Sequence, residues 1–171
     1  MLEVGKMAEY QNILVGIDGS KQSLLAFKKA VAIAQRNGAR LHLLSVVNGE
    51  PYPSAITTFG ISDKGLYDKV VDKMKHLLAD LTTQAQAAGV QDVKTSVVVG
   101  NAKVILTDTY PKDEDIDLIL VGATGLNTIG RMIVGSTSAY IVRQAPCDVV
   151  VVKTDEDNQP VTFKQATYPE I

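Results

Sequence analysis

The sequence predicts an α/β fold built on a mainly parallel sheet of five strands. Short apolar runs rich in β-branched residues alternate with segments whose apolar residues recur every three or four positions. The strand-like runs are apolar without strict alternation, as expected when helices cover both faces of a sheet. No repeat, low-complexity segment or linker divides the 171 residues, so we expect one domain spanning residues 1–171.

The first strand and the first helix differ in the spacing of their apolar residues, and each is followed by residues that typically end such an element. Asn12 to Ile17 is a buried-strand pattern, and the polar turn from Asp18 to Ser20 ends it. A helix then ends at Asn37-Gly38, and a second strand covers Leu41 to Val47. Two prolines and two glycines make Asn48 to Gly60 a predicted loop. The first helix places its apolar residues at helical spacing: Leu24, Phe27, Val31 and Ala34.

A long second helix is predicted between this loop and Gly89. Ser62 or Asp63 is expected to cap its N-terminus. The third strand follows at Val93 to Val99, where Lys94 and Ser96 alternate with valines. The apolar stripe of the long helix consists of Leu66, Val70, Met74, Leu77, Leu81, Ala85 and Ala88.

The second half of the chain repeats the alternation around a glycine-rich loop. Asn101 is expected to cap a shorter helix that runs to about Thr109. Ile116 to Val121 is the fourth predicted strand, and the glycine-rich loop from Gly122 to Gly135 follows it directly.

The last helix and strand close the predicted domain. The helix covers Ser136 to Arg143 and is ended by Pro146. The fifth strand is Asp148 to Val152, and the polar tail from Thr154 is expected to pack poorly. Three residues of the helix are predicted to be buried: Ala139, Ile141 and Val142.

Composition argues against several classes of function. The formal net charge is −2, and no basic block favours nucleic acid or a membrane surface. The chain has no Trp and few other aromatics, which makes a base-stacking platform improbable. No segment approaches the ~18 apolar residues of a membrane span, and residues 1–11 lack the apolar region of a signal peptide. We expect a cytoplasmic protein without nucleic-acid or membrane partners.

Other chemically active side chains give weak signals. Cys147 is the single cysteine and begins an apolar strand, so a buried structural thiol is favoured over a nucleophile. His42 and His76 match no metal site or catalytic pair and are expected to be structural or solvated. An acidic cluster before the fourth strand is expected to be a solvated loop rather than a cation site; its members are Asp113, Glu114, Asp115 and Asp117.

The glycine-rich loop has the chemistry of a phosphate site. Gly122 and Gly125 lack Cβ atoms, which would allow positive φ and a close approach of the backbone to a ligand. The N-terminus of the following helix offers unpaired N–H groups, and Arg131 within the loop is a weaker candidate for screening phosphate charge. The alternative of a plain tight turn stays open, because neither a Walker lysine nor a dinucleotide fingerprint is present. Further donors at the helix start are Gly135, Ser136, Thr137 and Ser138.

A second loop with unusual chemistry follows the first strand and contains Gly16, Ile17 and Asp18. In an open parallel sheet, ligands bind beyond the carboxyl ends of the strands where the strand order reverses. Asp18 can contact a ribose hydroxyl or hold Mg²⁺ beside phosphates. It is equally possible that Asp18 or Ser20 only caps the next helix.

These residues resemble the universal stress protein family. Gly122, Gly125, Gly135 and Ser136 reproduce the family's ATP-binding motif G-2x-G-9x-G-(S/T) without a gap. Residues 13–20 resemble its opening strand and Asp-containing loop, and residues 145–152 resemble its closing strand. The resemblance covers residues 10–153 and leaves out the tail, residues 154–171. One departure is Gly16, where many members carry proline.

The resemblance implies a Rossmann-like fold, similar to the adenine nucleotide alpha hydrolases, with strand order 3-2-1-4-5. It also implies ATP as ligand with Mg²⁺ or Mn²⁺, the metal beside Asp18 and the adenine at the backbone of Val46. The phosphates would then meet the glycines and hydroxyls between Gly122 and Ser138. A homodimer through the last strand, Asp148 to Val152, is a common property of the family.

The predicted function is that of an ATP-binding regulatory module of the stress response with at most slow ATP hydrolysis. An ATP-hydrolysing or adenylyl-transferring enzyme is one alternative, although no nucleophile and base pair is recognisable. The other alternative is a dimeric stress-response interaction module that does not depend on nucleotide.

Overall fold

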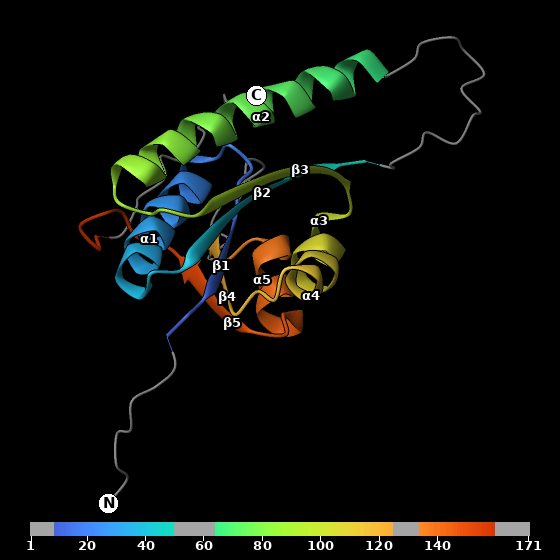
Figure 1. Cartoon of the computed structure of the whole chain (residues 1–171). Helices are drawn as coiled ribbons and strands as arrows, with labels where there is room; N and C mark the ends of the chain where they lie inside the picture. Colours follow the sequence, from blue (N-terminus) through green and yellow to red (C-terminus); the bar gives the residue numbers. More distant parts are fainter. Residues whose placement is uncertain (1–8, 50–63, 125–133, 160–171) are drawn as a thin grey trace, which may run out of the picture.

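The computed structural model describes residues 9–49, 64–124 and 134–159, and its five strands form one sheet (Figure 1). The strand order is β3-β2-β1-β4-β5, and every neighbouring pair is parallel. The predicted fold class and strand order are therefore confirmed. The strands are β1 (Asn12–Gly16), β2 (Arg40–Asn48), β3 (Val93–Gly100), β4 (Leu118–Gly122) and β5 (Asp148–Val152).

Helices cover both faces of this sheet. Figure 1 shows α1 and α2 on one side of the sheet, and α3, α4 and α5 on the other. The strand order reverses between β1 and β4, which are hydrogen-bonded neighbours: β2 and β3 lie on one side of this pair, and β5 lies on the other. The helices are α1 (Lys21–Asn37), α2 (Lys64–Ala87), α3 (Ala102–Val104), the π-helical turn η1 (Ile105–Thr109), α4 (Tyr110–Asp113) and α5 (Ser136–Gln144).

Local sequence signals fix both ends of α1. The Ser20 hydroxyl accepts a hydrogen bond from the Ser23 N–H at 3.1 Å, which satisfies one of the unpaired donors of the first turn. Gly38 adopts a φ of 62° and its N–H bonds carbonyls of the last turn, the usual left-handed end of a helix. The predicted stop at Asn37-Gly38 is confirmed.

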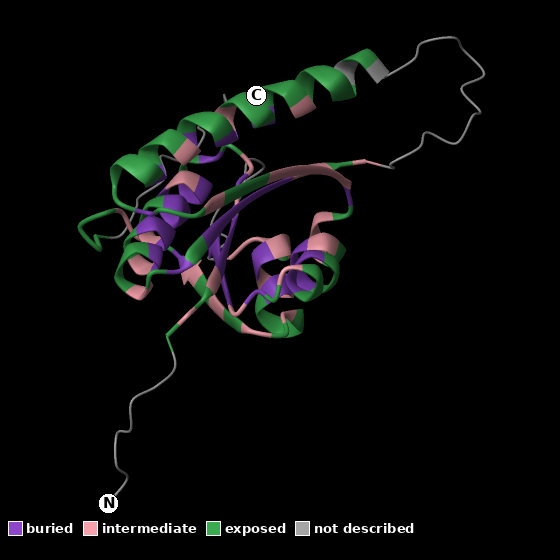
Figure 2. Cartoon of the chain, in the orientation of Figure 1, coloured by how far each residue is buried: buried purple, intermediate pink, exposed green. Residues whose placement is uncertain are grey.

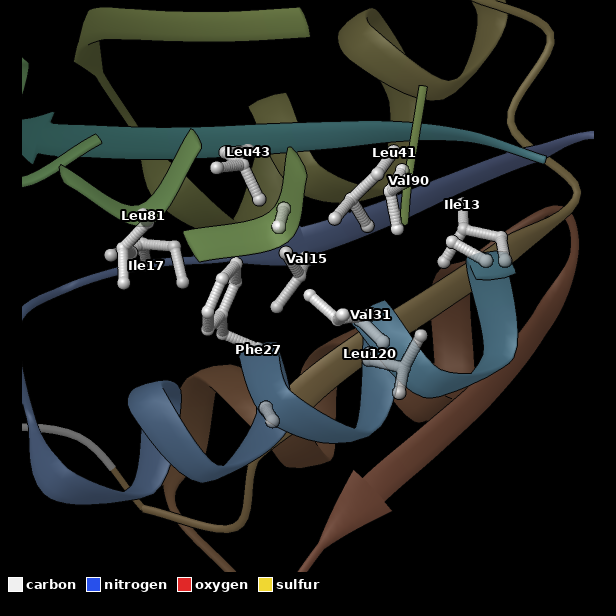
Figure 3. Close-up of a cluster of buried hydrophobic side chains, with 14 of the residues drawn as sticks. Ile13, Val15, Ile17, Phe27, Val31, Leu41, Leu43, Leu81, Val90 and Leu120 are labelled. Carbon is white, nitrogen blue, oxygen red and sulfur yellow. The ribbon is translucent and has the colours of Figure 1, made fainter. Parts of the chain in front are cut away.

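The larger hydrophobic core lies between the sheet and α1 with α2. Figure 3 shows Phe27 and Val31 of α1 pointing toward Val15 and Leu120 of the central strands. Leu81 of α2 reaches the same cluster and is 4% exposed. The central strands β1, β2 and β4 are mostly buried, whereas the edge strands β3 and β5 and the outer faces of the helices are largely half-buried or exposed (Figure 2).

A second core lies on the opposite face, under α3 to α5. Because side chains alternate along a strand, Leu14, Leu44 and Ile119 point away from the first core. They pack with Leu106 of η1 and Ile141 of α5. Both faces of the central strands are therefore apolar, which explains why their sequences do not alternate.

The predicted stripe of α2 is correct only in the middle of its length. Met74, Leu81 and Ala85 are buried as the spacing predicts. Val70 is 37% exposed and Ala88 is exposed, whereas Leu78, which lies outside the predicted stripe, is 1% exposed. The N-terminal part of α2 lies beyond the core, so the apolar residues there have no sheet to pack against (Figure 2).

Two further predictions about helices are wrong. Val142 was expected to be buried but is 54% exposed, because it lies on the outer side of α5 next to the fully buried Ile141. The helix capped by Asn101 does not end near Thr109 but continues to Asp113 through η1. The widened π-helical turn lies directly before Pro111, whose ring would clash with an ordinary preceding turn.

The described part of the polar tail is mostly exposed, and two of its side chains contact α1. Lys28 of α1 pairs with Glu156 at 2.7 Å, and the neighbouring Lys29 donates to Asn158. Both contacts are exposed, so they hold the tail against α1 only weakly. In the described ranges, no helix is both long and apolar enough to cross a bilayer.

Candidate functional site

A cleft of about 890 Å³ opens at the carboxyl ends of β1, β2 and β4. This is the position at which open α/β sheets bind ligands, and the volume is typical of small-molecule sites. The lining comes from the loop after β1, the ends of β2 and β4, the start of α5, and side chains of α2 and η1. The sequence-predicted residues that line it are Gly16, Ile17, Asp18, Val46, Gly122, Gly135, Ser136, Thr137 and Ser138.

The loop after β1 is held by its own hydrogen bonds. An Asp18 carboxylate oxygen accepts the Ser20 N–H at 2.9 Å, and the Asp18 N–H donates to the Ser23 hydroxyl at 3.4 Å. Gly19 has a φ of 81°, a conformation that favours glycine. Ser20 is the helix cap, whereas Asp18 stabilises the loop with one oxygen and also lines the cleft.

Gly122 lines the cleft and also has a packing role that its position in the motif does not predict. It does not use the positive φ that a glycine allows. A Cβ at this residue would lie 2.7 Å from the backbone carbon and from the Cβ of Gln22. This distance is shorter than the contacts that Cβ atoms make in real proteins. Gly122 therefore lets the start of α1 pack against the end of β4, which requires the absence of a side chain.

The Ser138 hydroxyl makes a hydrogen bond within the protein. Its hydroxyl donates to the carbonyl of Gly122 at 2.8 Å, and the residue is 7% exposed. The Gly135 N–H likewise donates to the carbonyl of Ala123 at 2.7 Å. These two bonds join the start of α5 to the end of β4, so neither donor is available to a phosphate.

Within the described residues, the first turn of α5 keeps unpaired donors beside the cleft. Gly135 is the N-cap residue with φ −70° and ψ 160°, and no side chain caps the helix. Ser136 and Thr137, the first two helical residues, both line the cleft. Their N–H groups and the positive end of the helix dipole favour an anion at this point.

Sequence reasoning missed much of the remaining lining of the cleft, including Thr124 and Lys73. Thr124 is 7% exposed, and its hydroxyl has no hydrogen-bond partner in the described chain. Its only sequence signal is a hydroxyl between the glycines of the motif. Lys73 of α2 also lines the cleft, and no sequence pattern connects that helix with the two loops. The predicted residues Gly125 and Arg131 lie outside the described residues.

The described residues of the cleft offer few ligands for a metal ion. Asp18 is the one carboxylate among the described residues that line it. In the same residues no group of three or more potential metal ligands occurs. Mg²⁺ is commonly bound by one or two carboxylates together with phosphate oxygens, and Asp18 fits that arrangement.

His42 lies away from the cleft and is fully buried in β2. Its Nδ1 lies 3.3 Å from the Tyr110 hydroxyl, and its Nε2 has no partner within the described residues. Burial lowers the pKa of His42, although the carboxylate of Glu114 acts in the opposite direction. A neutral, buried imidazole with this partner agrees with the structural role that we predicted, whereas His76 is exposed.

The acidic residues before β4 are engaged in structural contacts. Lys94 donates to both oxygens of Glu114 at 2.6 and 2.7 Å, and this contact lowers the pKa of Glu114. The carboxylate of Asp117 accepts the backbone N–H groups of Gln11 and Asn12. These contacts tie the ends of β1 and β3 to the α4–β4 connection.

Cys147 is half-buried at the start of β5. Burial and the carboxylates of Asp117 and Asp148 raise the pKa of its thiol to about 11. The thiol is therefore protonated at neutral pH, as expected for a structural cysteine rather than a nucleophile.

The sheet and the cleft define a Rossmann-like α/β protein with a ligand-sized site at the point where the strand order reverses. Known proteins of this kind match the chain over most of its length. The model of the universal stress protein family matches residues 9–153. A Staphylococcus epidermidis protein named as a universal stress protein is 40% identical over 157 residues, which are 90% of this chain and 92% of its own.

Solved structures of universal stress proteins also match this chain. The universal stress protein UspA from Lactobacillus plantarum has 35% identity and a TM-score of 0.71, covering 85% of this chain and 99% of its own. A universal stress protein crystallised in complex with cAMP has 28% identity and a TM-score of 0.61, covering 84% of this chain and 97% of its own. This chain belongs to the universal stress protein family.

Proposed function

We propose that this protein binds ATP in the cleft and acts as a nucleotide-dependent regulatory module of the stress response. One observation carries the proposal: the uncapped first turn of α5 and the carboxylate of Asp18 line the same cleft. The first turn of α5 suits a chain of phosphates, and the carboxylate of Asp18 suits a ribose hydroxyl or a phosphate-bound metal. The cAMP complex of a family member supports an adenine nucleotide as the class of ligand.

The cleft has separate regions for the parts of a nucleotide. The lining from β2 and η1 contains Val46, Leu44 and Leu106, an apolar surface suited to a base. The backbone N–H groups of Ser136 and Thr137 suit the phosphates. Asp18 would hold Mg²⁺ or Mn²⁺ together with phosphate oxygens, and the metal would supply charge neutralisation there.

Catalysis is at most a minor part of the proposed function. Among the described residues that line the cleft, no Cys or His accompanies the hydroxyl groups. An activated nucleophile needs an adjacent base, and Asp18 is the only carboxylate in this part of the lining. We therefore expect slow hydrolysis and propose that occupancy of the cleft, rather than turnover, carries the signal.

Substitutions at Ser136 test the phosphate site. Proline is tolerated at the first position of a helix, and the extended backbone of Gly135 is compatible with a following proline. Ser136→Pro removes one N–H donor and the hydroxyl, whereas the matched control Ser136→Ala removes only the hydroxyl. Loss of a charge-assisted hydrogen bond of about 1.5–3 kcal/mol predicts ATP affinity about 10- to 100-fold weaker for Ser136→Pro by calorimetry.

The two variants separate the site from the fold. Ser136→Ala should bind ATP within about twofold of the parent, since a neutral contact at an exposed position contributes little. Circular dichroism should show an intact α5 in both variants. Equal ATP affinity in the proline variant and the parent would show that the first turn of α5 does not bind the phosphates.

We also propose a cytoplasmic homodimer that pairs through β5. This strand is at the edge of the sheet, and its outward-facing Val150 is 38% exposed. An apolar edge strand needs a partner or cover to avoid non-specific pairing. Sedimentation velocity at micromolar concentration tests the dimer, and a monomer at all concentrations would contradict it.

A further inference from the structure

The N-terminal half of α2 is fixed beside the mouth of the cleft at two points. The Tyr67 ring occupies the space beside Gly49, after β2, where a Cβ would lie 2.7 Å from the ring. Met74 and Leu77 lie against Gly19 of the loop after β1, at 3.8 and 3.9 Å from the position of a Cβ. This half of the helix therefore connects the two chain segments that leave β1 and β2.

The residues between these two contacts belong to the cleft. Val70, Lys73, Met74 and Leu77 all line it, at the spacing of one helix face. This explains why Val70 remains 37% exposed although it belongs to the apolar stripe. It faces the ligand space rather than the protein core.

Lys73 is the one cation among the described residues of this lining. Among the described residues around the cleft, only Lys73 and Asp18 carry a charge. Within the described chain, Lys73 forms no salt bridge, since no carboxylate oxygen lies within 4.0 Å of its ammonium group. By contrast, Lys75, two residues along the same helix, pairs with Asp72 at 3.9 Å. Lys73 lies in α2 directly before Met74, the residue that contacts Gly19 of the loop after β1.

We propose that Lys73 is a charge-selecting residue of the cleft, which makes affinity rise with the number of phosphates on the ligand. The inference rests on the proposed nucleotide site and extends it to a helix outside the glycine motif. A free ammonium on a wall of the cleft attracts a polyphosphate and has no favourable interaction with an uncharged nucleoside. The residue is therefore a specificity determinant rather than a part of the fold.

The test compares Lys73→Met with the parent for ATP, ADP, AMP and adenosine by calorimetry. Methionine keeps the length and the apolar stem of the side chain while removing its charge. Lys69→Met is the matched control, since Lys69 is an exposed lysine of α2 that does not line the cleft. Lys73→Arg should restore the parent's preference for ATP.

We expect ATP to bind Lys73→Met about three- to fivefold more weakly, as for one exposed charge contact at low salt. Adenosine affinity should change less than twofold, and the ATP difference should shrink at high salt. An equal loss for ATP and adenosine, or no loss while the parent binds ATP, would overturn the role of Lys73 alone. No binding of any of the four ligands to the parent would overturn the nucleotide site itself and this inference with it.

Discussion

Replacing Gly122 by alanine tests whether this motif glycine serves packing. In the structure, a methyl group here would lie 2.7 Å from the backbone carbon and the Cβ of Gln22, and 2.9 Å from the Gln22 carbonyl oxygen. Two of these atoms are backbone at the start of α1, so no side-chain rotation can relieve the overlap. Gly16→Ala is the matched control, because Gly16 also ends a strand but its Cβ would meet only side chains, at 3.6 Å.

The expected magnitude follows from the cost of overpacking a close contact. Adding a methyl group at a tightly packed site costs about 1–3 kcal/mol, and α1 must shift to accept it. For a chain of this size that corresponds to a melting temperature lower by roughly 3–10 °C. Gly16→Ala should leave stability unchanged or raise it by up to about 1 kcal/mol, since alanine restricts the unfolded chain.

Urea unfolding followed by circular dichroism measures both variants against the parent. A destabilised Gly122→Ala beside a neutral Gly16→Ala would establish that Gly122 is needed for helix–strand packing even without ligand. Equal stability of all three proteins would refute the reasoning, and the motif glycine would then have to be explained by ligand approach alone.

Two buried titratable groups give further predictions. Burial lowers the pKa of His42 in the folded protein, so below about pH 6.5 the unfolded chain binds a proton that the folded chain does not. The free energy of unfolding should therefore fall as the pH drops below about 6.5, by up to about 1.4 kcal/mol per pH unit. Urea unfolding at pH 5.5 and 7.5 should show this slope, and His42→Leu should reduce it; an unchanged slope would contradict the assignment. The Cys147 thiol, with its pKa raised from 9.0 to about 11, should react with iodoacetamide at pH 7.5 about 100-fold more slowly than an unperturbed cysteine. A rate equal to that of free cysteine, measured by mass spectrometry, would contradict this.

Sequence patterns were sufficient for the sheet and for α1. The apolar runs without alternation predict buried parallel strands, and the observed strands begin and end within about two residues of the prediction. Ser20 and Gly38 mark the ends of α1 by local chemistry that does not depend on the rest of the fold. The strand order followed from the family resemblance and not from the residues themselves.

The errors in predicting which helix residues are buried share one physical cause. Helical spacing identifies an apolar face but not how far that face overlaps its neighbours. Val70 and Val142 are apolar residues that lie where no other element covers them, on α2 and α5 respectively. Burial at such positions depends on the length of the sheet and the placement of each helix, which a local pattern does not contain.

The site was predicted at the level of loops but not of individual atoms. The two loops after β1 and β4 line one cleft, as their positions after parallel strands predict. The roles of Gly122 and Ser138 depend on contacts with Gln22 and with each other, and these are visible only in three dimensions. Lys73 belongs to the cleft because α2 packs beside Gly19, a contact between residues distant in sequence.

The most direct test of the central claim is a calorimetric titration of ATP with Mg²⁺ into the nucleotide-stripped protein. The cleft with its uncapped helix start and Asp18 predicts saturable binding near one ATP per chain, weakened in Ser136→Pro and preserved in Ser136→Ala. No binding at millimolar ATP would contradict the nucleotide module and would favour an interaction module that works without nucleotide.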